Sequence, residues 1–280
     1  WIQPAAGDAG GSLGAALAYW HLALGNQRDV PSRRDHMQGA YLGPEYSQES
    51  IEVELTRIGA VYQVASQRDL LSATVDSLVA GNAVGWFQGR MEFGPRALGM
   101  RSILADPRSS ATQRNLNLKI KFRESFRPFA PAVLAERVSE WFRYAHTSPY
   151  MLVTAPVATE HRQDLGDTTG LFGIDLLDRP RSTVPAITHV DYSARLQTVH
   201  ADTNPRFHAL ITEFEHRTGT PILVNTSFNV RGEPIVMSPE DAFRCFMGTD
   251  MDLLVIGNCV LTKSEQTVER IDHASAFGLD

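Results

Sequence analysis

The 280-residue sequence predicts an α/β fold in which buried strands alternate with helices. Two observations support this prediction. Short apolar runs have the length expected of buried strands, at residues 83–87, 150–157, 186–190, 222–224 and 253–256. Apolar residues at helical spacing lie between them, at residues 51–58, 70–78, 206–216 and 239–247. In folds of this class the loops at strand ends carry the chemistry.

The N-terminal segment reads like the inside of a domain, because the sequence begins at Trp1 without an initiator methionine. Gly10 and Gly11 would let the backbone approach a ligand closely, and residues 12–18 predict a helix whose N–H groups could face a phosphate. Asp8 precedes this helix, where it would act as an N-cap or as one metal ligand among several. Residues 26–48 are polar and irregular, which predicts a linker.

The charge distribution is uneven. The chain carries a formal charge of −6, yet residues 90–127 hold nine Lys or Arg residues against three acids. A local basic cluster in an acidic chain suits a small anionic ligand, whereas a nucleic-acid binder is usually basic throughout. We therefore expect no nucleic-acid partner. The cations alternate with Gly, Pro and Phe, which is unlike a solvated helical face.

Membrane and disulfide signals are missing from the sequence. No apolar run approaches the roughly 20 residues that a membrane span needs, and no signal segment begins the sequence. We therefore expect a cytoplasmic protein with no membrane partner. Cys245 and Cys259 lack a Cys-x-x-Cys spacing and are expected to be buried structural thiols.

Two short motifs predict a site for a nucleoside triphosphate. Lys121 and Arg123 form a Lys-x-Arg pair, with Arg127 four residues further on, and phosphate oxygens are bound by both kinds of cation. A Ser-x-Asn motif, Ser227 and Asn229, follows a predicted strand together with Asn225. Its amides and hydroxyl would orient phosphate oxygens. The alternative role for these polar residues is turn capping.

Two further segments have constrained backbones. Residues 89–99 are bounded by glycines, which predicts a loop that folds tightly around an anion, with Arg96 as its charged residue; the alternative is a turn with exposed arginines. Prolines in residues 126–131 fix an extended path. There, Phe126 and Phe129 are expected to pack on the core while Arg127 points away.

Four segments carry a resemblance to a known family. They are Gly-Arg-Met-Glu-Phe-Gly-Pro-Arg-Ala-Leu-Gly (89–99), Arg-Glu-Ser-Phe-Arg-Pro-Phe-Ala-Pro (123–131), Val-Asp-Tyr-Ser-Ala-Arg-Leu-Gln-Thr-Val (190–199) and Asn-Thr-Ser-Phe-Asn-Val-Arg-Gly-Glu-Pro-Ile-Val (225–236). The sequence resembles the O-carbamoyltransferases of antibiotic and nodulation-factor biosynthesis. Such enzymes join an actin- or sugar-kinase-like domain to a YrdC-like domain with a twisted mixed sheet and flanking helices. Residues 1–48 match the end of the first domain plus a linker, and residues 49–280 match the second.

The resemblance implies a two-step reaction. The YrdC-like domain would form carbamoyl adenylate from carbamoyl phosphate and ATP, with Mg²⁺ expected beside the triphosphate. The upstream transferase half, on the same or a separate chain, would pass the carbamoyl group to a hydroxyl of a natural-product acceptor. The implied catalytic residues are Lys121, Arg96, Arg127 and Ser227, and the implied nucleotide-binding residues are Arg123, Met151, Arg195, Asn225 and Asn229.

The resemblance also implies that Asp8 binds Fe²⁺ in the upstream domain, together with histidines that precede Trp1. His21 and His36 do not restore that pattern by their spacing. We therefore expect this chain, as a fragment of a longer polypeptide, to form the adenylate without completing the transfer.

Two alternatives remain open at this stage. One is a free-standing enzyme like the threonylcarbamoyl-adenylate synthases, against which the Asp8 segment argues. The other is a non-catalytic module that binds nucleotides or RNA. Nothing in the sequence selects the acceptor.

Overall fold

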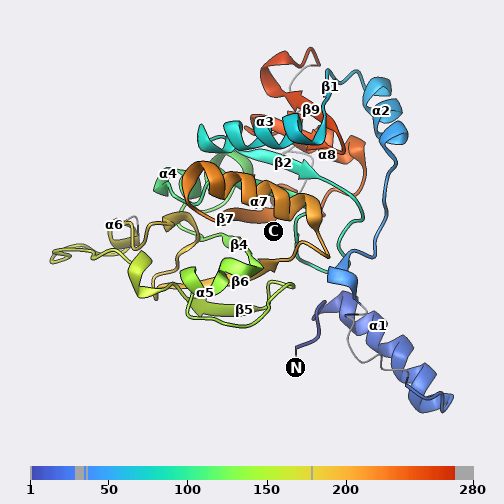
Figure 1. Cartoon of the computed structure of the whole chain (residues 1–280), viewed down its shortest axis with the longest axis horizontal. Helices are drawn as coiled ribbons and strands as arrows, with labels where there is room; N and C mark the ends of the chain where they lie inside the picture. The colour runs from blue at the N-terminus through green and yellow to red at the C-terminus, as the bar shows by residue number, and fades with distance from the viewer. Residues whose placement is uncertain (1, 29–34, 36, 178, 269–280) are drawn as a thin grey trace.

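The computed structural model describes the chain apart from residues 1, 29–34, 36, 178 and 269–280 (Figure 1). In the described part, the strands form one nine-stranded sheet with the order β1-β9-β8-β2-β3-β7-β4-β6-β5. The β2–β8 and β4–β6 pairs are parallel and the other neighbours are antiparallel. The predicted α/β class is therefore confirmed, with a mixed sheet.

The strands are short. They are β1 (Gln63–Val64), β2 (Val84–Phe87), β3 (Arg101–Ala105), β4 (Ala130–Leu134), β5 (Val153–Pro156), β6 (Ser193–Val199), β7 (Ile222–Ser227), β8 (Leu253–Ile256) and β9 (Cys259–Thr262). The α-helices are α1 (Asp8–Ala18), α2 (Gln48–Arg57), α3 (Gln67–Val79), α4 (Ser110–Asn115), α5 (Val138–Trp141), α6 (Ile174–Leu177), α7 (Pro205–Thr218) and α8 (Pro239–Met247). Short π-helical turns extend α1 and α4, as η1 (Tyr19–Ala23) and η3 (Leu116–Ile120). Single 3₁₀ turns are η2 (Gln38–Ala40), η4 (Ala135–Arg137), η5 (Thr159–His161), η6 (Pro185–Ile187) and η7 (Lys263–Glu265).

Helices cover both faces of the sheet. α3 and α7 lie side by side on one face, where they contact β2, β4, β7 and β8 (Figure 1). α8 packs on β2 and β8 and contacts α2, on the opposite face. Successive residues of a strand therefore enter different cores: Trp86 packs with α3 and α7, while its neighbour Phe87 packs with α2 and α8. Burial of both faces explains why these strands have continuous apolar sequences.

The sequence located the helices better than the strands. Helices at the four predicted places are confirmed as α2, α3, α7 and α8, and serine or asparagine side chains cap each N-terminus. The strands predicted from residues 83–87, 150–157, 222–224 and 253–256 are confirmed as β2, β5, β7 and β8. The prediction did not include β3, β4, β6 or the β1–β9 pair.

The strand predicted at residues 186–190 is wrong. The structure has the 3₁₀ turn η6 there, which begins at Pro185. Side-chain hydroxyls satisfy the backbone locally, because Val184 N–H donates to Ser182 Oγ and Thr188 Oγ donates to the Val184 carbonyl. The segment is therefore buried as a turn, without strand pairing.

Helix α1 begins at Asp8, four residues before the start that the sequence predicted, at residue 12. The residue at the N-cap is Gly7, with a φ of 121°, and no side chain caps the helix, so the capping role considered for Asp8 is wrong. No residue of α1 is buried, and the helix projects away from the body of the protein (Figure 1). Large apolar side chains in and after it are exposed, among them Trp20 and Leu22.

The described end of the predicted linker packs against the loop at residues 89–99. Gly43 N–H donates to the Met91 carbonyl, and Met91 N–H donates to the Pro44 carbonyl, both at 2.9 Å. The Tyr41 hydroxyl donates to the Leu98 carbonyl. These residues are therefore held in place rather than freely extended.

Two smaller expectations concern burial. Cys245 and Cys259 are buried free thiols, as expected, and burial raises the pKa of both. Within the described ranges, no helix is both long enough and apolar enough to cross a bilayer.

Gly99 provides a test of the packing between this loop and α7. Its φ is +104°, and a Cβ at this position would overlap the Phe207 ring. Gly99→Ala is expected to lower the free energy of unfolding by about 3 kcal/mol, from backbone strain and overpacking together. The measurement is urea unfolding.

Gly166→Ala is the matched control, because Gly166 also has a positive φ, +65°, but nothing lies within 4 Å of its added Cβ. We expect a loss of about 1 kcal/mol from strain alone. Equal losses in the two variants would contradict the packing role of Gly99.

Candidate functional site

The sequence-predicted site residues converge on one edge of the sheet. β2, β7 and β8 end at this edge, and β3, β4 and β6 begin there, as the pairs Phe87–Arg101, Ser102–Ser227 and Ala130–Asn225 show. The loop at residues 89–99 connects β2 to β3 at the same edge. Segments more than a hundred residues apart in sequence are therefore neighbours here.

A buried carboxylate organises the 89–99 loop. Glu92 is 6% exposed, and its Oε1 accepts the N–H groups of Leu98 at 2.6 Å and Met100 at 2.8 Å. Burial raises the pKa of Glu92, while these backbone donors act in the opposite direction. The loop thus folds around its own Glu92 side chain, while binding of an anion by Arg96 stays a prediction.

The Arg101 side chain also holds this loop in place, and it was not identified from the sequence as a functional residue. Its guanidinium is fully buried, donates to the Gly89 and Pro44 carbonyls, and lies 3.5 Å from the centre of the Phe87 ring. Burial lowers the pKa of Arg101 to about 10, although Glu92 opposes the shift. Arg101 is the first residue of the buried strand β3, and it was missed because the sequence did not predict that strand.

The Lys-x-Arg and Ser-x-Asn motifs meet directly. Lys121 follows η3, and its Nζ donates to the Ser227 carbonyl, to Asn229 O and to Asn229 Oδ1, the last two at 2.8 Å. The Ser227 hydroxyl in turn donates to Asn229 Oδ1 at 2.6 Å. Lys121 is 4% exposed, and this burial lowers its pKa to about 7. The surrounding oxygens favour the ammonium form, so the site can hold this proton or lose it near neutral pH.

Four arginines form a cluster beside this lysine. Burial lowers the pKa of Arg195, and the positive charges of Arg96 and Arg123 lower it further. The pKa of Arg123 is lowered first by burial and then by Arg127. These interactions link Arg96 to Arg195, Arg195 to Arg123, and Arg123 to both Arg127 and Lys121. We call Arg96, Lys121, Arg123, Arg127 and Arg195 the cation cluster.

Among the described residues, two acidic side chains act on the cation cluster: Glu233 raises the pKa of Lys121, and Glu124 raises that of Arg123. Arg127 pairs with Glu124 at 2.9 Å, and both side chains are about half exposed. Arg123 donates to the neutral Asn117 amide at 2.6 Å and lies over the Phe129 ring. Nε atoms of Arg96 and Arg195 are buried without a hydrogen-bond partner in the part of the chain that the structure describes. The cluster therefore carries excess positive charge, together with donors suited to phosphate oxygens.

Asn225 links the cluster to the loop. Its amide donates to the Ala97 carbonyl at 3.1 Å and to Gln197 Oε1 at 2.6 Å, and Gln197 donates to the Leu98 carbonyl. The Asn225 Oδ1 atom is buried and unpartnered among the described residues. Asn225 thus braces the loop that carries Arg96 and leaves one acceptor unused. Gln197, on β6, was not identified from the sequence because β6 was not predicted.

Met151 and Phe126 differ from the other predicted residues. Met151 is 3% exposed and packs with Ala40, Leu98 and Ala130, so its side chain belongs to a small core next to the loop. Phe126 is 42% exposed, and the expectation that it packs on the core is wrong. Phe129, three residues later, is buried as expected.

The predicted Fe²⁺ site is not assembled by this chain's described residues. Asp8 is exposed at the start of α1, and no group of three or more His, Cys, Asp or Glu side chains in the described ranges could hold a metal. His21 Nδ1 contacts the Asn26 carbonyl, and His36 lies outside the described residues. Asp8 alone does not fit an iron centre.

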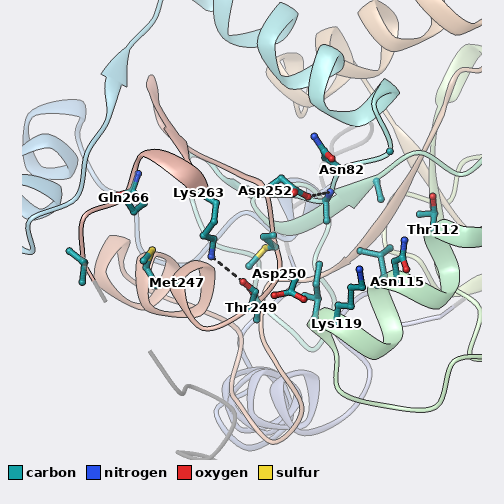
Figure 2. A pocket seen from close by; sticks show the side chains of 17 residues that line it. Asn82, Thr112, Asn115, Lys119, Met247, Thr249, Asp250, Asp252, Lys263 and Gln266 are labelled. Atoms are coloured by element: carbon teal, nitrogen blue, oxygen red, sulfur yellow. Dashed lines mark hydrogen bonds between the residues drawn. The ribbon is translucent and has the colours of Figure 1, made fainter. Parts of the chain in front are cut away.

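A cavity of about 560 Å³ lies at the opposite edge of the sheet. Its lining includes Ala105 at the end of β3 and Asp252 just before β8. Figure 2 shows Thr112, Asn115 and Lys119 on one side of this cavity and Lys263 and Gln266 on the other. None of the sequence-predicted site residues lines it. Lys119 and Lys121, two residues apart in the sequence, thus lie at opposite edges of the sheet.

Comparison with known proteins gives a family. The family model described as carbamoyltransferase C-terminus matches residues 75–263. The uncharacterized protein sll1178 of Synechocystis sp. is 58% identical over 269 residues, which cover 95% of this chain and 44% of that protein. The nodulation protein NolO of Bradyrhizobium diazoefficiens is 40% identical over 273 residues, covering 96% and 45% of the two chains.

Two more distant similarities concern proteins with named activities or ligands. The 3'-hydroxymethylcephem-O-carbamoyltransferase of Streptomyces clavuligerus is 36% identical over 187 residues, covering 67% of this chain and 32% of that enzyme. Full-length HypF, solved in a phosphate- and nucleotide-bound form, aligns with a TM-score of 0.43 and 16% identity over 70% of this chain and 22% of that one. An overlap this low carries no argument about ligands.

The chain spans less than half the length of these curated relatives. The family model nevertheless covers well over half of the chain, including the 89–99 loop, Lys121, Arg123, Arg195 and the Ser-x-Asn motif. The family resemblance expected from the sequence is confirmed: the chain belongs to the carbamoyltransferase C-terminal family.

Proposed function

We propose that the cation cluster binds ATP together with carbamoyl phosphate and forms carbamoyl adenylate, as one step of carbamoyl transfer to a hydroxyl group. The observation that carries this proposal is the convergence of Lys121 and four arginines at one sheet edge, where Glu124 and Glu233 are the acidic groups that act on them among the described residues. Such excess positive charge suits three phosphates better than it suits a folded protein without a ligand.

The proposed reaction balances in two stages. Carbamoyl phosphate and water give carbamate and inorganic phosphate, and a carbamate oxygen then attacks the α-phosphorus of ATP with departure of pyrophosphate. The carbamoyl carbon of the adenylate is next attacked by the acceptor hydroxyl, which releases AMP and one proton. In the first stage the protein's main contributions are positioning of the reactants and neutralisation of phosphate charge.

Individual residues have distinct proposed roles. Lys121, held by Ser227 and Asn229, is placed to neutralise phosphate charge when ligand oxygens replace these contacts. Arg96 and Arg195 have buried Nε atoms that a phosphate or carbamoyl oxygen would satisfy. Arg127 would exchange Glu124 for phosphate.

The amide-bearing residues and Met151 complete the proposal. Arg123, on Phe129, and Asn229 would contact the triphosphate. The unpartnered Oδ1 of Asn225 would accept a hydrogen bond from the carbamoyl NH₂ group. Met151 would support the 89–99 loop through the small core in which both pack. Mg²⁺ is expected to accompany ATP, where it would neutralise part of the phosphate charge.

The remaining part of the proposal concerns the upstream half. We propose that residues 1–48 end an actin- or sugar-kinase-like transferase domain and that residues 49–280 form the adenylate-forming, YrdC-like domain. Exposed apolar side chains near α1 and the greater length of the relatives support this division. Asp8 would bind Fe²⁺ only with ligands supplied from outside this chain. The similarity to the cephem O-carbamoyltransferase supports an acceptor that receives the carbamoyl group on a hydroxyl oxygen. The described residues do not identify that acceptor.

Lys121→Ala and Ser227→Ala are expected to weaken ATP binding at least about tenfold and to abolish carbamoyl-phosphate-dependent release of pyrophosphate, because each removes a charge or hydroxyl at the phosphate site. ATP binding is measured by calorimetry and pyrophosphate by a coupled assay. Lys119→Ala is the matched control, since Lys119 lines the cavity at the other edge (Figure 2).

Equal losses in Lys119→Ala would show that the effect of Lys121 is not local. Absence of ATP binding by the unchanged chain, or pyrophosphate release that does not need carbamoyl phosphate, would overturn the proposed function. Salt-sensitive RNA binding without turnover would instead support a binding module.

The pKa of Lys121 predicts a pH dependence. A nearby triphosphate favours the ammonium form, so ATP binding raises this pKa from about 7 and takes up a proton above that pH. ATP affinity is therefore expected to fall as pH rises from 7.5 to 9, by up to about tenfold per pH unit. Lys121→Met should remove the slope, and an unchanged slope in that variant would assign the titration to another group. Calorimetry at several pH values, with Mg²⁺ constant, makes the measurement.

A further inference from the structure

A second cleft opens at the same edge of the sheet, beyond the cation cluster. Its volume is about 380 Å³, within the range of small-molecule sites. The parallel strands β2 and β8 end side by side at Phe87 and Ile256, and the residues that follow them, Gln88, Gly257 and Asn258, line the cleft. The remaining walls come from residues 45–51, Met100 and the start of α7. Clefts outside the carboxyl ends of parallel strands are common ligand sites.

Arg206 is the distinctive group in this cleft. Its Nη1 donates to Gln88 Oε1 at 2.7 Å and to the Gly257 carbonyl at 3.1 Å, and its Nη2 donates to Asn258 Oδ1 at 2.8 Å. All three acceptors are neutral, and no acidic side chain pairs with Arg206 among the described residues. The guanidinium is thus fixed in position while its charge stays uncompensated.

Several donors of the cleft are unused. Arginine has five N–H groups, and the contacts above occupy three of them, which leaves two for a ligand. The Asn258 amide nitrogen likewise has no partner within the described ranges. Glu45 also lines the cleft, but its carboxylate pairs with Arg90 at 3.3 Å and both side chains are about half exposed. A cleft rich in donors with a fixed cation favours an anion.

Beside the polar Gln48 and Asn204, the lining also has an apolar part, which includes Tyr46, Ile51, Met100 and Pro205. The Tyr46 ring lies 6.0 Å from the Phe87 ring and tilts against it. We infer that this cleft binds a small molecule that carries one carboxylate or phosphate on a compact apolar body, with Arg206 and Asn258 binding the anionic group.

This site is separate from the cation cluster and goes beyond the proposed function. The 89–99 loop and its continuation lie between the two: Met100 faces the cleft, whereas the Ala97 carbonyl accepts from Asn225 on the cluster side. A molecule in the cleft would contact the loop that carries Arg96 without occupying the adenylate site.

Fluorine NMR titrations of the chain with 4-fluorobenzoate and with 4-fluorophenyl phosphate, without ATP, test the inference and separate the two anion types. We expect saturable binding of one or both probes. Arg206→Gln should weaken it at least about tenfold, because the fixed charge is lost. Asn258→Asp should weaken probe binding similarly, because the new carboxylate would neutralise the charge of Arg206. It would also keep the acceptor that Arg206 now uses, so the arginine stays in position.

Two controls define the result. Arg217→Gln removes an ion-paired surface arginine from α7, the helix that also carries Arg206, and should leave probe binding unchanged. Arg96→Gln removes a charge from the cation cluster and should leave the probe binding that depends on Arg206 unchanged. Thermal unfolding of each variant identifies any loss of fold, and Asn258→Asp is expected to remain folded. No saturable binding, equal binding by Asn258→Asp and the unchanged chain, or loss of the Arg206-dependent binding in Arg96→Gln would overturn the inference.

Discussion

Burial of both faces of the central strands constrains everything else in this protein. β2, β3, β4, β7 and β8 have helices or loops packed on each side, so almost all of their side chains enter one of two apolar cores. Charged groups that act on a ligand therefore have places only at strand ends. At one edge those ends bring together Arg101, Arg195 and Ser227 from separate strands with the 89–99 loop.

Buried charges at this edge differ in how many partners the fold gives them. Glu92 and Arg101 have partners inside the fold: backbone N–H groups donate to Glu92 Oε1, and the Arg101 guanidinium donates to backbone carbonyls and lies on an aromatic ring, although Glu92 Oε2 and Arg101 Nε have no partner among the described residues. They hold the loop rather than a ligand. Arg96 and Arg195 differ in degree: their buried Nε atoms have no partner either, and within the described part of the chain their guanidinium groups donate no hydrogen bond. Since a fold usually satisfies its buried polar groups, Arg96 and Arg195 support the ligand site proposed above.

The edge has a modular organisation. The cation cluster lies by β4, β6 and β7, while the Arg206 cleft lies by β2 and β8, and the loop between β2 and β3 contacts both. Because one loop carries Arg96 and borders the cleft through Met100, the proposed second ligand would contact an element of the proposed adenylate site. The cavity of Figure 2 lies at the opposite edge, where η3 exposes Lys119 before turning Lys121 inward.

The sequence by itself determined the fold class, four of the helices, the family and the motifs that meet at the site. Continuous apolar runs and helical spacing depend on local burial, and Lys121, Ser227 and Asn229 were recognisable as phosphate-binding types from their chemistry alone. Only the tertiary structure decided what each group contacts. β3, β4 and β6 begin with Arg101, Ala130 and Ser193, and their strand conformation depends on distant neighbours rather than on their own pattern. Glu92 and Gln197 could not be found for the same reason, since their partners are backbone atoms and an amide that folding brings into reach. Arg206 looked like an ordinary residue of a helix start, and its uncompensated charge exists only because β2 and β8 end beside it.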